Sequence, residues 1–151
     1  MIQGKIEHEL PIGWVYARLN DISEKVTDGT HFTPIYLASG IPFISVKDVF
    51  DEKVHFDDCR HISPEAHALL TKRCNPECSD VLITKSGTIG RVAVVKTIQP
   101  FSLFVSVALI KPFKEHLDSG FIAFALKNFI NSINIQQSVK GGVIKNLHIE
   151  D

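Results

Sequence analysis

The segment at 85–91 combines cationic side chains, hydroxyls and glycines, the residue types that a phosphate-binding loop needs. Its polar members are Lys85, Ser86, Thr88 and Arg91. Gly87 and Gly90 let backbone amides approach an anion closely, and the two cations flank them. No Gly-Lys-Ser/Thr closes the segment, so it is not a Walker A loop. On the spacing alone, contact with nucleic acid and a hairpin loop with solvated ends both stay open.

A second polar segment follows the turn signal Asp28-Gly29. Thr30, His31 and Thr33 offer two hydroxyls and an imidazole, groups that can read base edges in the major groove of DNA. Turn chemistry alone also explains these residue types, because such side chains commonly bond to their own backbone. From the sequence, DNA contact and a self-bonded turn both stay open.

Two isolated lysines are further candidates for DNA contact. Lys47 stands beside Asp48 after an apolar run, and Lys140 precedes Gly141-Gly142. A lysine in a loop or at a strand end is usually just solvated, which is the alternative for both.

The sequence lacks the patterns of a catalytic or metal site. Cys74 and Cys78 form a single pair with stray histidines upstream, whereas structural zinc prefers two regularly spaced pairs. Asn75-Pro76 begins a motif that lacks the second proline and the aromatic residue with which adenine methyltransferases hold a flipped base. The histidines have no partner pattern for acid–base catalysis, and no serine nucleophile elbow is present. We therefore predict no catalytic residue, no metal and no cofactor.

Runs of apolar and β-branched residues predict the strands that must position these loops. The runs lie at 14–19, 43–46, 53–56, 81–85, 91–96 and 105–110. By their pattern, the strands at 81–85 and 91–96 form a hairpin around the first polar segment, and Pro112 stops the strand that follows. A short helical turn is expected at 21–24. The apolar stretch at 143–149 is expected to pair as a last strand.

Two helices are predicted. One has Ser63 as N-cap and Pro64 at its first position, and runs to about Lys72. The other begins at Asp118 or Ser119 and carries apolar residues at spacings of three and four, which we interpret as core. That stripe consists of Ile122, Leu126, Phe129, Ile130 and Ile133. The predicted fold class is α+β, with a mostly antiparallel, strongly bent sheet and about two helices.

Length and composition are those of one ordinary globular domain of 151 residues. A net charge of −1 counts against a protein that grips DNA by electrostatics alone, but it allows one basic face. No apolar run is long enough to span a bilayer, and the first residues lack the apolar region of a signal peptide. Three irregularly spaced cysteines argue against a disulfide framework, so a cytoplasmic location is expected.

Four blocks of the sequence carry a family resemblance. They are Leu10-Pro11-Ile12-Gly13-Trp14 with Arg18-Leu19-Asn20-Asp21-Ile22, Asp28 to Tyr36, Gly40 to Asp48, and Asp80 to Arg91. In content and order they resemble the DNA target-recognition domains of type I restriction-modification specificity subunits. One departure is Ser79, where the family usually has glycine, so the turn before the hairpin is expected to be built differently.

The resemblance implies the domain plan and the partners. A full specificity subunit resembles two recognition domains joined by helical spacers, so residues 1–151 are expected to form a single recognition domain, with a lead-in at 1–11 and without the spacer helix. The implied partner is double-stranded DNA, one half of a split site, with a second recognition domain of the same subunit reading the other half. Modification subunits would methylate adenine with S-adenosylmethionine, and motor-nuclease subunits would translocate and cleave DNA with ATP. No membrane partner is implied.

Three other functions remain possible on the sequence alone. The same domain could serve a single-chain restriction-methyltransferase or a standalone adenine methyltransferase. A small enzyme or metal-binding protein would need a convergent set of residues that the sequence does not offer. A structural interaction domain without DNA affinity is the third.

Overall fold

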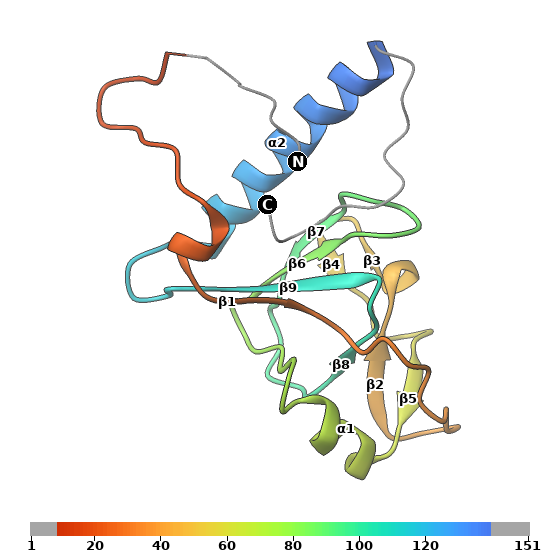
Figure 1. Cartoon of the computed structure of the whole chain (residues 1–151). Helices are drawn as coiled ribbons and strands as arrows, with labels where there is room; N and C mark the ends of the chain where they lie inside the picture. Colours follow the sequence, from red (N-terminus) through yellow and green to blue (C-terminus); the bar gives the residue numbers. More distant parts are fainter. Residues whose placement is uncertain (1–8, 140–151) are drawn as a thin grey trace.

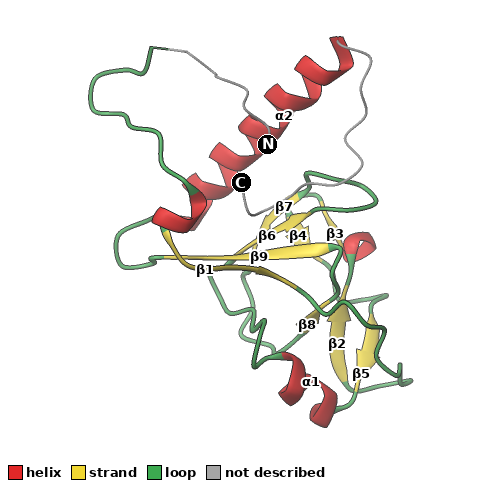
Figure 2. Ribbon diagram, in the orientation of Figure 1, coloured by secondary structure: helices red, strands yellow, loops and turns green. Residues whose placement is uncertain are grey.

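Within residues 9–139, which the computed structural model describes, the chain forms nine strands, two α-helices and two short 3-10 turns (Figure 1). The strands are β1 (Ser23–Asp28), β2 (Ile41–Ile44), β3 (Val49–Phe50), β4 (Lys53–Val54), β5 (Arg60–Ile62), β6 (Val81–Thr84), β7 (Val92–Val94), β8 (Ser102–Leu103) and β9 (Val107–Pro112). The helices are α1 (Pro64–Leu70) and α2 (Ser119–Val139), and the turns are η1 (Leu19–Asp21) and η2 (Val46–Asp48). Figure 2 shows α2 and α1 at opposite ends of the molecule, with the strands between them.

A four-stranded antiparallel sheet in the order β1-β9-β6-β7 is the centre of the fold. Strands β6 and β9 are apolar on both faces because both faces are covered. Successive side chains of a strand point to opposite faces of the sheet. Leu82 and Leu109 therefore pack in one core cluster, whereas Val81 and Ile110 pack in a second cluster with α2. The sheet therefore separates two cores, and its loops are held from both sides.

Two smaller sheets complete the architecture. Strands β5, β2 and β8 form one sheet, in which β2 and β8 run parallel, a pairing that the sequence pattern did not predict. Strands β3 and β4 form a hairpin whose two turn residues, Asp51 and Glu52, have φ of 49° and 60°, as a type I′ turn requires. The predicted class, α+β with mostly antiparallel sheets and two helices, is confirmed.

Local signals for the helices and the hairpin are confirmed. The Ala66 N–H donates to Ser63 Oγ at 3.1 Å, which caps α1, although the helix ends at Leu70 and not near Lys72. The Phe121 N–H donates to Asp118 Oδ1 at 2.7 Å, which caps α2. Strands β6 and β7 pair antiparallel around the polar loop.

The predicted strand at 14–19 is wrong, and the true first strand was missed. Residues 11–18 are exposed and form no strand, and the expected helical turn at 21–24 is replaced by η1 and the start of β1. Strand β1 has the polar sequence Ser-Glu-Lys-Val-Thr-Asp, because it is an edge strand held mainly by its pairing with β9. Pro112 is the last residue of β9, opposite Ser23 of β1 and beyond the pairing of β9 with β6, so the strand ends at this proline as predicted.

The predicted apolar stripe of α2 is only partly core. Ile122 and Ile130 are buried, but Phe129 is 49% exposed, so its assignment to the core is wrong. Gly141-Gly142, the expected strand at 143–149 and Lys140 lie outside the described residues. None of the described helices has the length and apolar character needed to cross a membrane.

Candidate nucleic-acid interface

The carboxylate of Asp28, at the end of β1, is the meeting point of the two polar segments. The residue is 5% exposed and three basic side chains surround it. Arg73 Nη2 donates to Asp28 Oδ1 at 2.5 Å, and His31 Nε2 lies 3.1 Å from the same oxygen. Lys85 Nζ donates to Asp28 Oδ2. We call Asp28, His31, Arg73 and Lys85 the Asp28 cluster.

Electrostatics keep this buried carboxylate ionised. Burial acts to raise the pKa of Asp28, but the hydrogen bonds from Lys85, His31 and Arg73 outweigh it and leave the pKa below its ordinary value. One carboxylate then balances only one of the two permanent cations, so the cluster carries net positive charge. The side chain of Arg73 is 54% exposed, so this charge reaches the surface.

The loop after β1 is fixed by backbone contacts to the segment between β8 and β9. The Thr30 N–H donates to the Leu103 carbonyl at 2.9 Å, and the Val105 N–H donates to the Thr30 carbonyl at 3.0 Å. Thr30 is buried, and its hydroxyl accepts from the Phe32 N–H at 3.3 Å. The Thr30 hydroxyl thus bonds within its own turn, and contact of Thr30 with DNA stays a prediction. His31 and Thr33 are exposed on the same loop.

The loop between β6 and β7 is closed by Thr84. Its hydroxyl donates to the Thr88 carbonyl at 2.5 Å and accepts from the Arg91 N–H at 2.9 Å. Ser86 is half-buried and Thr88 is exposed at the tip. The loop therefore presents its tip to solvent on a rigid base.

The predicted cations of this loop and its neighbour already have protein partners. The Lys85 side chain is 19% exposed and bound to Asp28, and Arg91 Nη1 donates to the Val49 carbonyl at 3.3 Å. Lys47 Nζ lies 2.8 Å from Asp48 Oδ1, with its side chain half exposed. The structure thus brings Lys85 and His31 together and leaves Arg91 and Lys47 near η2. Contact of these residues with DNA stays a prediction.

Sequence reasoning missed Arg73, which lies beyond the end of α1. Nothing in its neighbours indicates a role, because its partner Asp28 is distant in sequence and only the fold brings them together. A second missed pair is Arg60 and Tyr36, where the guanidinium carbon lies 5.3 Å from the ring centroid on an exposed surface.

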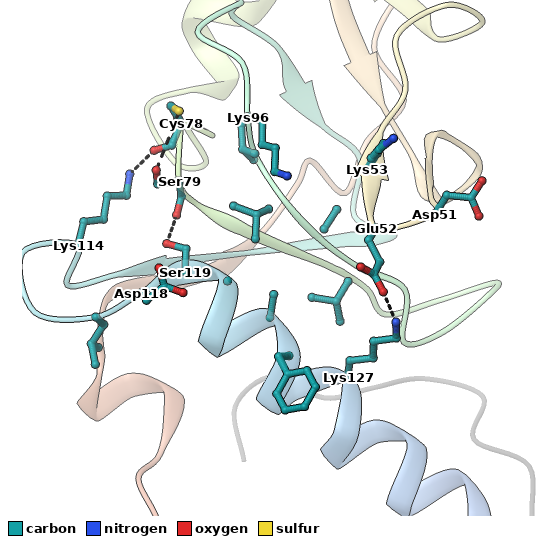
Figure 3. Close-up of a pocket in the computed structure, with 18 of the residues that line it drawn as sticks. Asp51, Glu52, Lys53, Cys78, Ser79, Lys96, Lys114, Asp118, Ser119 and Lys127 are labelled. Atoms are coloured by element: carbon teal, nitrogen blue, oxygen red, sulfur yellow. Dashed lines mark hydrogen bonds and ion pairs between the residues drawn. The ribbon is translucent and has the colours of Figure 1, made fainter.

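An open groove of about 900 Å³ lies between α2 and β7 (Figure 3), and no residue of the Asp28 cluster lines it. Lys127 Nζ is paired with Glu52 across it, and Ser119 Oγ donates to the Ser79 carbonyl at 2.5 Å at its other end. Its lining includes the apolar side chains of Val92 and Val94 from β7 and Ala123 from α2. These contacts hold α2 against the sheet. Of the predicted site residues within 9–139, none lines the groove. Among the described residues, no three histidine, cysteine or acidic side chains are grouped to hold a metal.

The chain is similar in sequence to one curated protein and in fold to two solved structures. A type I restriction enzyme EcoBI specificity subunit from Escherichia coli is 30% identical over 115 residues, which are 76% of this chain and 24% of that protein. The crystal structure of an HsdS subunit from Thermoanaerobacter tengcongensis is similar over 82% of this chain and 29% of its own, with a TM-score of 0.58 and 20% identity. A second solved structure, which addresses complex assembly and conformational transition of the type I R-M system, is also similar. The similarity covers 97% of this chain and 34% of that chain, with a TM-score of 0.66 and 16% identity.

Fold and sequence together define a DNA specificity domain. Residues 11–151 match the family model described as the type I restriction modification DNA specificity domain, so the chain belongs to this family. The resemblance carried by the four sequence blocks is confirmed. The chain spans about a quarter to a third of the length of these relatives.

Proposed function

We propose that this domain binds double-stranded DNA sequence-specifically and reads one half of a bipartite site within a type I restriction-modification specificity subunit. Membership of the DNA specificity family over residues 11–151 carries the proposal. The net positive Asp28 cluster supports it, because DNA-binding surfaces place cations where phosphates pass. The proposed contacts to DNA bases or to the DNA backbone are three exposed residues. His31 and Thr33 lie on the loop after β1, and Thr88 lies on the loop between β6 and β7.

The proposed partners are a second recognition domain of the same subunit, modification subunits that transfer the methyl group and motor-nuclease subunits. Exposed aromatic side chains on one side of the domain are consistent with assembly into a larger complex. Trp14 is 58% exposed and packs on Phe121 of α2, with ring centroids 5.9 Å apart, and Phe124 is 64% exposed. Apolar surface of this kind commonly marks protein interfaces. In this proposal the partner subunits carry out catalysis. The complex acts on DNA in the cytoplasm.

The near-neutral charge of the chain fits a division of labour in that complex. With a net charge of −1, the domain alone has little general attraction to DNA. Partner subunits would supply most phosphate contacts, and this domain would supply base readout. The isolated domain is therefore expected to bind DNA weakly and the assembled complex strongly.

A domain exchange tests this function. The chain replaces one recognition domain of a specificity subunit whose bipartite site is known, and the hybrid is assembled with its modification subunits. Sites are then selected from a random duplex library. We expect one half-site to change and the other half to stay. A folded, assembled hybrid that selects no new half-site would contradict the proposal, and the unexchanged subunit is the control.

A further inference from the structure

Arg73 is oriented as if to receive a second anion. Its Nη2 donates to Asp28 Oδ1 at 2.5 Å and its Nη1 donates to the Gly29 carbonyl at 3.1 Å. A guanidinium has five N–H donors in a plane, and within the described part of the chain the donors beyond these two have no partner, on a side chain that is 54% exposed. The buried carboxylate thus fixes the direction of an exposed cation.

The surroundings of Arg73 attract an anion rather than repel one. Lys25 Nζ donates to the Arg73 carbonyl at 2.5 Å, which adds a further ammonium to this edge of β1. Lys85 is mostly buried and faces Asp28, so it serves as the counterion of the carboxylate. The charge of Arg73 is then left without compensation inside the cluster. A simple structural ion pair would need only one of these cations.

We propose that Arg73 contacts a DNA backbone phosphate and that Asp28 is a positioning residue which, with Lys85 as its counterion, aims the guanidinium. This inference rests on the proposed function and deepens it, because it names a contact that no sequence motif indicates. A planar fork held by two hydrogen bonds suits a phosphate, whose oxygens accept two parallel donors. Phosphate contacts of this kind fix the register of a domain on the duplex without reading sequence.

The test measures DNA binding by the specificity subunit assembled with its modification subunits. Affinity for the selected site and for an unrelated duplex is followed by fluorescence anisotropy over a range of salt concentrations. For Arg73→Gln we expect binding to both duplexes to weaken by the same factor, about 3–10-fold, and the salt slope to fall by about one. Lys72→Gln, which removes a charge from the adjacent exposed residue, is the matched control and is expected to have a smaller effect.

Two further variants separate positioning from plain charge. Asp28→Asn adds a positive charge to the cluster, so a purely electrostatic role predicts tighter binding, whereas loss of positioning predicts weaker binding. Arg73→Lys keeps the charge and is expected to keep the salt slope but lose affinity, because an ammonium cannot hold the two hydrogen bonds and the phosphate in one plane. Thermal unfolding of each variant checks that the fold is intact, and Arg73→Lys serves if Arg73→Gln does not fold.

Different failures have different meanings. A selective wild-type complex whose Arg73→Gln variant keeps full affinity and salt slope overturns the inference and leaves the proposed function standing. Relaxed preference at one base position would overturn the phosphate contact in favour of a base contact. Tighter binding by Asp28→Asn would overturn the positioning role. A wild-type complex that binds no duplex would overturn the proposed function and this inference together.

Discussion

The carboxylate of Asp28, at the end of β1, is paired with the ammonium of Lys85, which follows β6, and β9 lies between these two strands. Fifty-seven positions separate the two residues in sequence. Asp28 stands opposite Ala108 of β9, and Thr84, which precedes Lys85, stands opposite Val107. The ion pair therefore ties together the loop after β1 and the loop after β6 at one end of the sheet. Both polar segments seen in the sequence are parts of a single surface.

Acid should weaken the fold through Asp28. The pKa of its carboxyl is lowered in the folded protein relative to the ordinary value of 3.8. A lowered folded-state pKa contributes stability that is present above the unfolded value and is lost as the pH falls through the folded value. We expect the difference in unfolding free energy between the wild type and Asp28→Asn to shrink as pH falls from about 5 to about 2. Urea unfolding across this range measures it, and a difference that is constant with pH would refute the assignment.

Neighbouring residues of α2 should differ sharply in their contribution to stability. Ile130 is 3% exposed and packs in the cluster between α2 and the sheet, so Ile130→Ala is expected to cost about 2–5 kcal/mol. Phe129 is 49% exposed, so Phe129→Ala is expected to cost under about 1 kcal/mol. Urea midpoints of the two variants compare them directly. Equal losses would mean that Phe129 has a packing partner within the domain.

Gly29 should not accept a side chain. A Cβ at this position would lie 2.1 Å from the Leu103 carbonyl oxygen and 2.5 Å from the Phe104 carbonyl carbon, and both are backbone atoms. Gly29→Ala must therefore separate the β1 loop from the β8–β9 segment, at a cost of about 1–3 kcal/mol or more.

Gly87→Ala provides the comparison for Gly29. At Gly87 a Cβ meets only the Val46 side chain at 3.4 Å, so the cost there comes from its φ of 77° and is about 1–2 kcal/mol. Thermal unfolding ranks the two variants. A milder effect at Gly29 than at Gly87 would contradict the close approach of the two backbones.

Replacing Ser79 by glycine should stabilise the domain. Ser79 has a φ of 69°, a left-handed conformation that L-residues adopt at a cost and glycine adopts freely. The sequence predicted a differently built turn here, but the structure keeps the glycine-like conformation with a serine in it. We expect Ser79→Gly to gain roughly 0.5–1 kcal/mol and Ser79→Ala to gain nothing. If calorimetry finds the same melting temperature for both, the turn carries no such strain.

The sequence predicted elements whose signals are local. Ser63 and Asp118 cap the helices as expected, and the apolar runs of β6 and β7 form the expected hairpin. Strand β1 was missed because its stability comes from pairing with β9, which no local pattern records. The run at 14–19 was assigned to a strand because its aromatic and β-branched residues have the composition of a buried strand, although residues 14–18 are exposed.

The sequence predicted the loops of the candidate site but not the side-chain contacts between them. Asp28 looked like a turn residue, because Asp-Gly is a turn signal and the burial of a carboxylate depends on partners elsewhere in the chain. Arg73 had no motif at all. Lys85 looked like a free cation at a loop tip, and only the folded sheet shows that it faces Asp28.

The pairing of β1 with β9 also constrains the order of events during synthesis. Asp28 is made long before its strand partner Ala108, and at about 5–20 residues per second the gap is roughly 4–16 s. Throughout that interval β1 is an unpaired edge, which is a template for association with other nascent chains. Its charged members, Glu24, Lys25 and Asp28, oppose such association because parallel, in-register pairing of two copies would set like charges beside each other. The polar composition that hides β1 from sequence analysis therefore protects the chain from aggregation until β9 emerges.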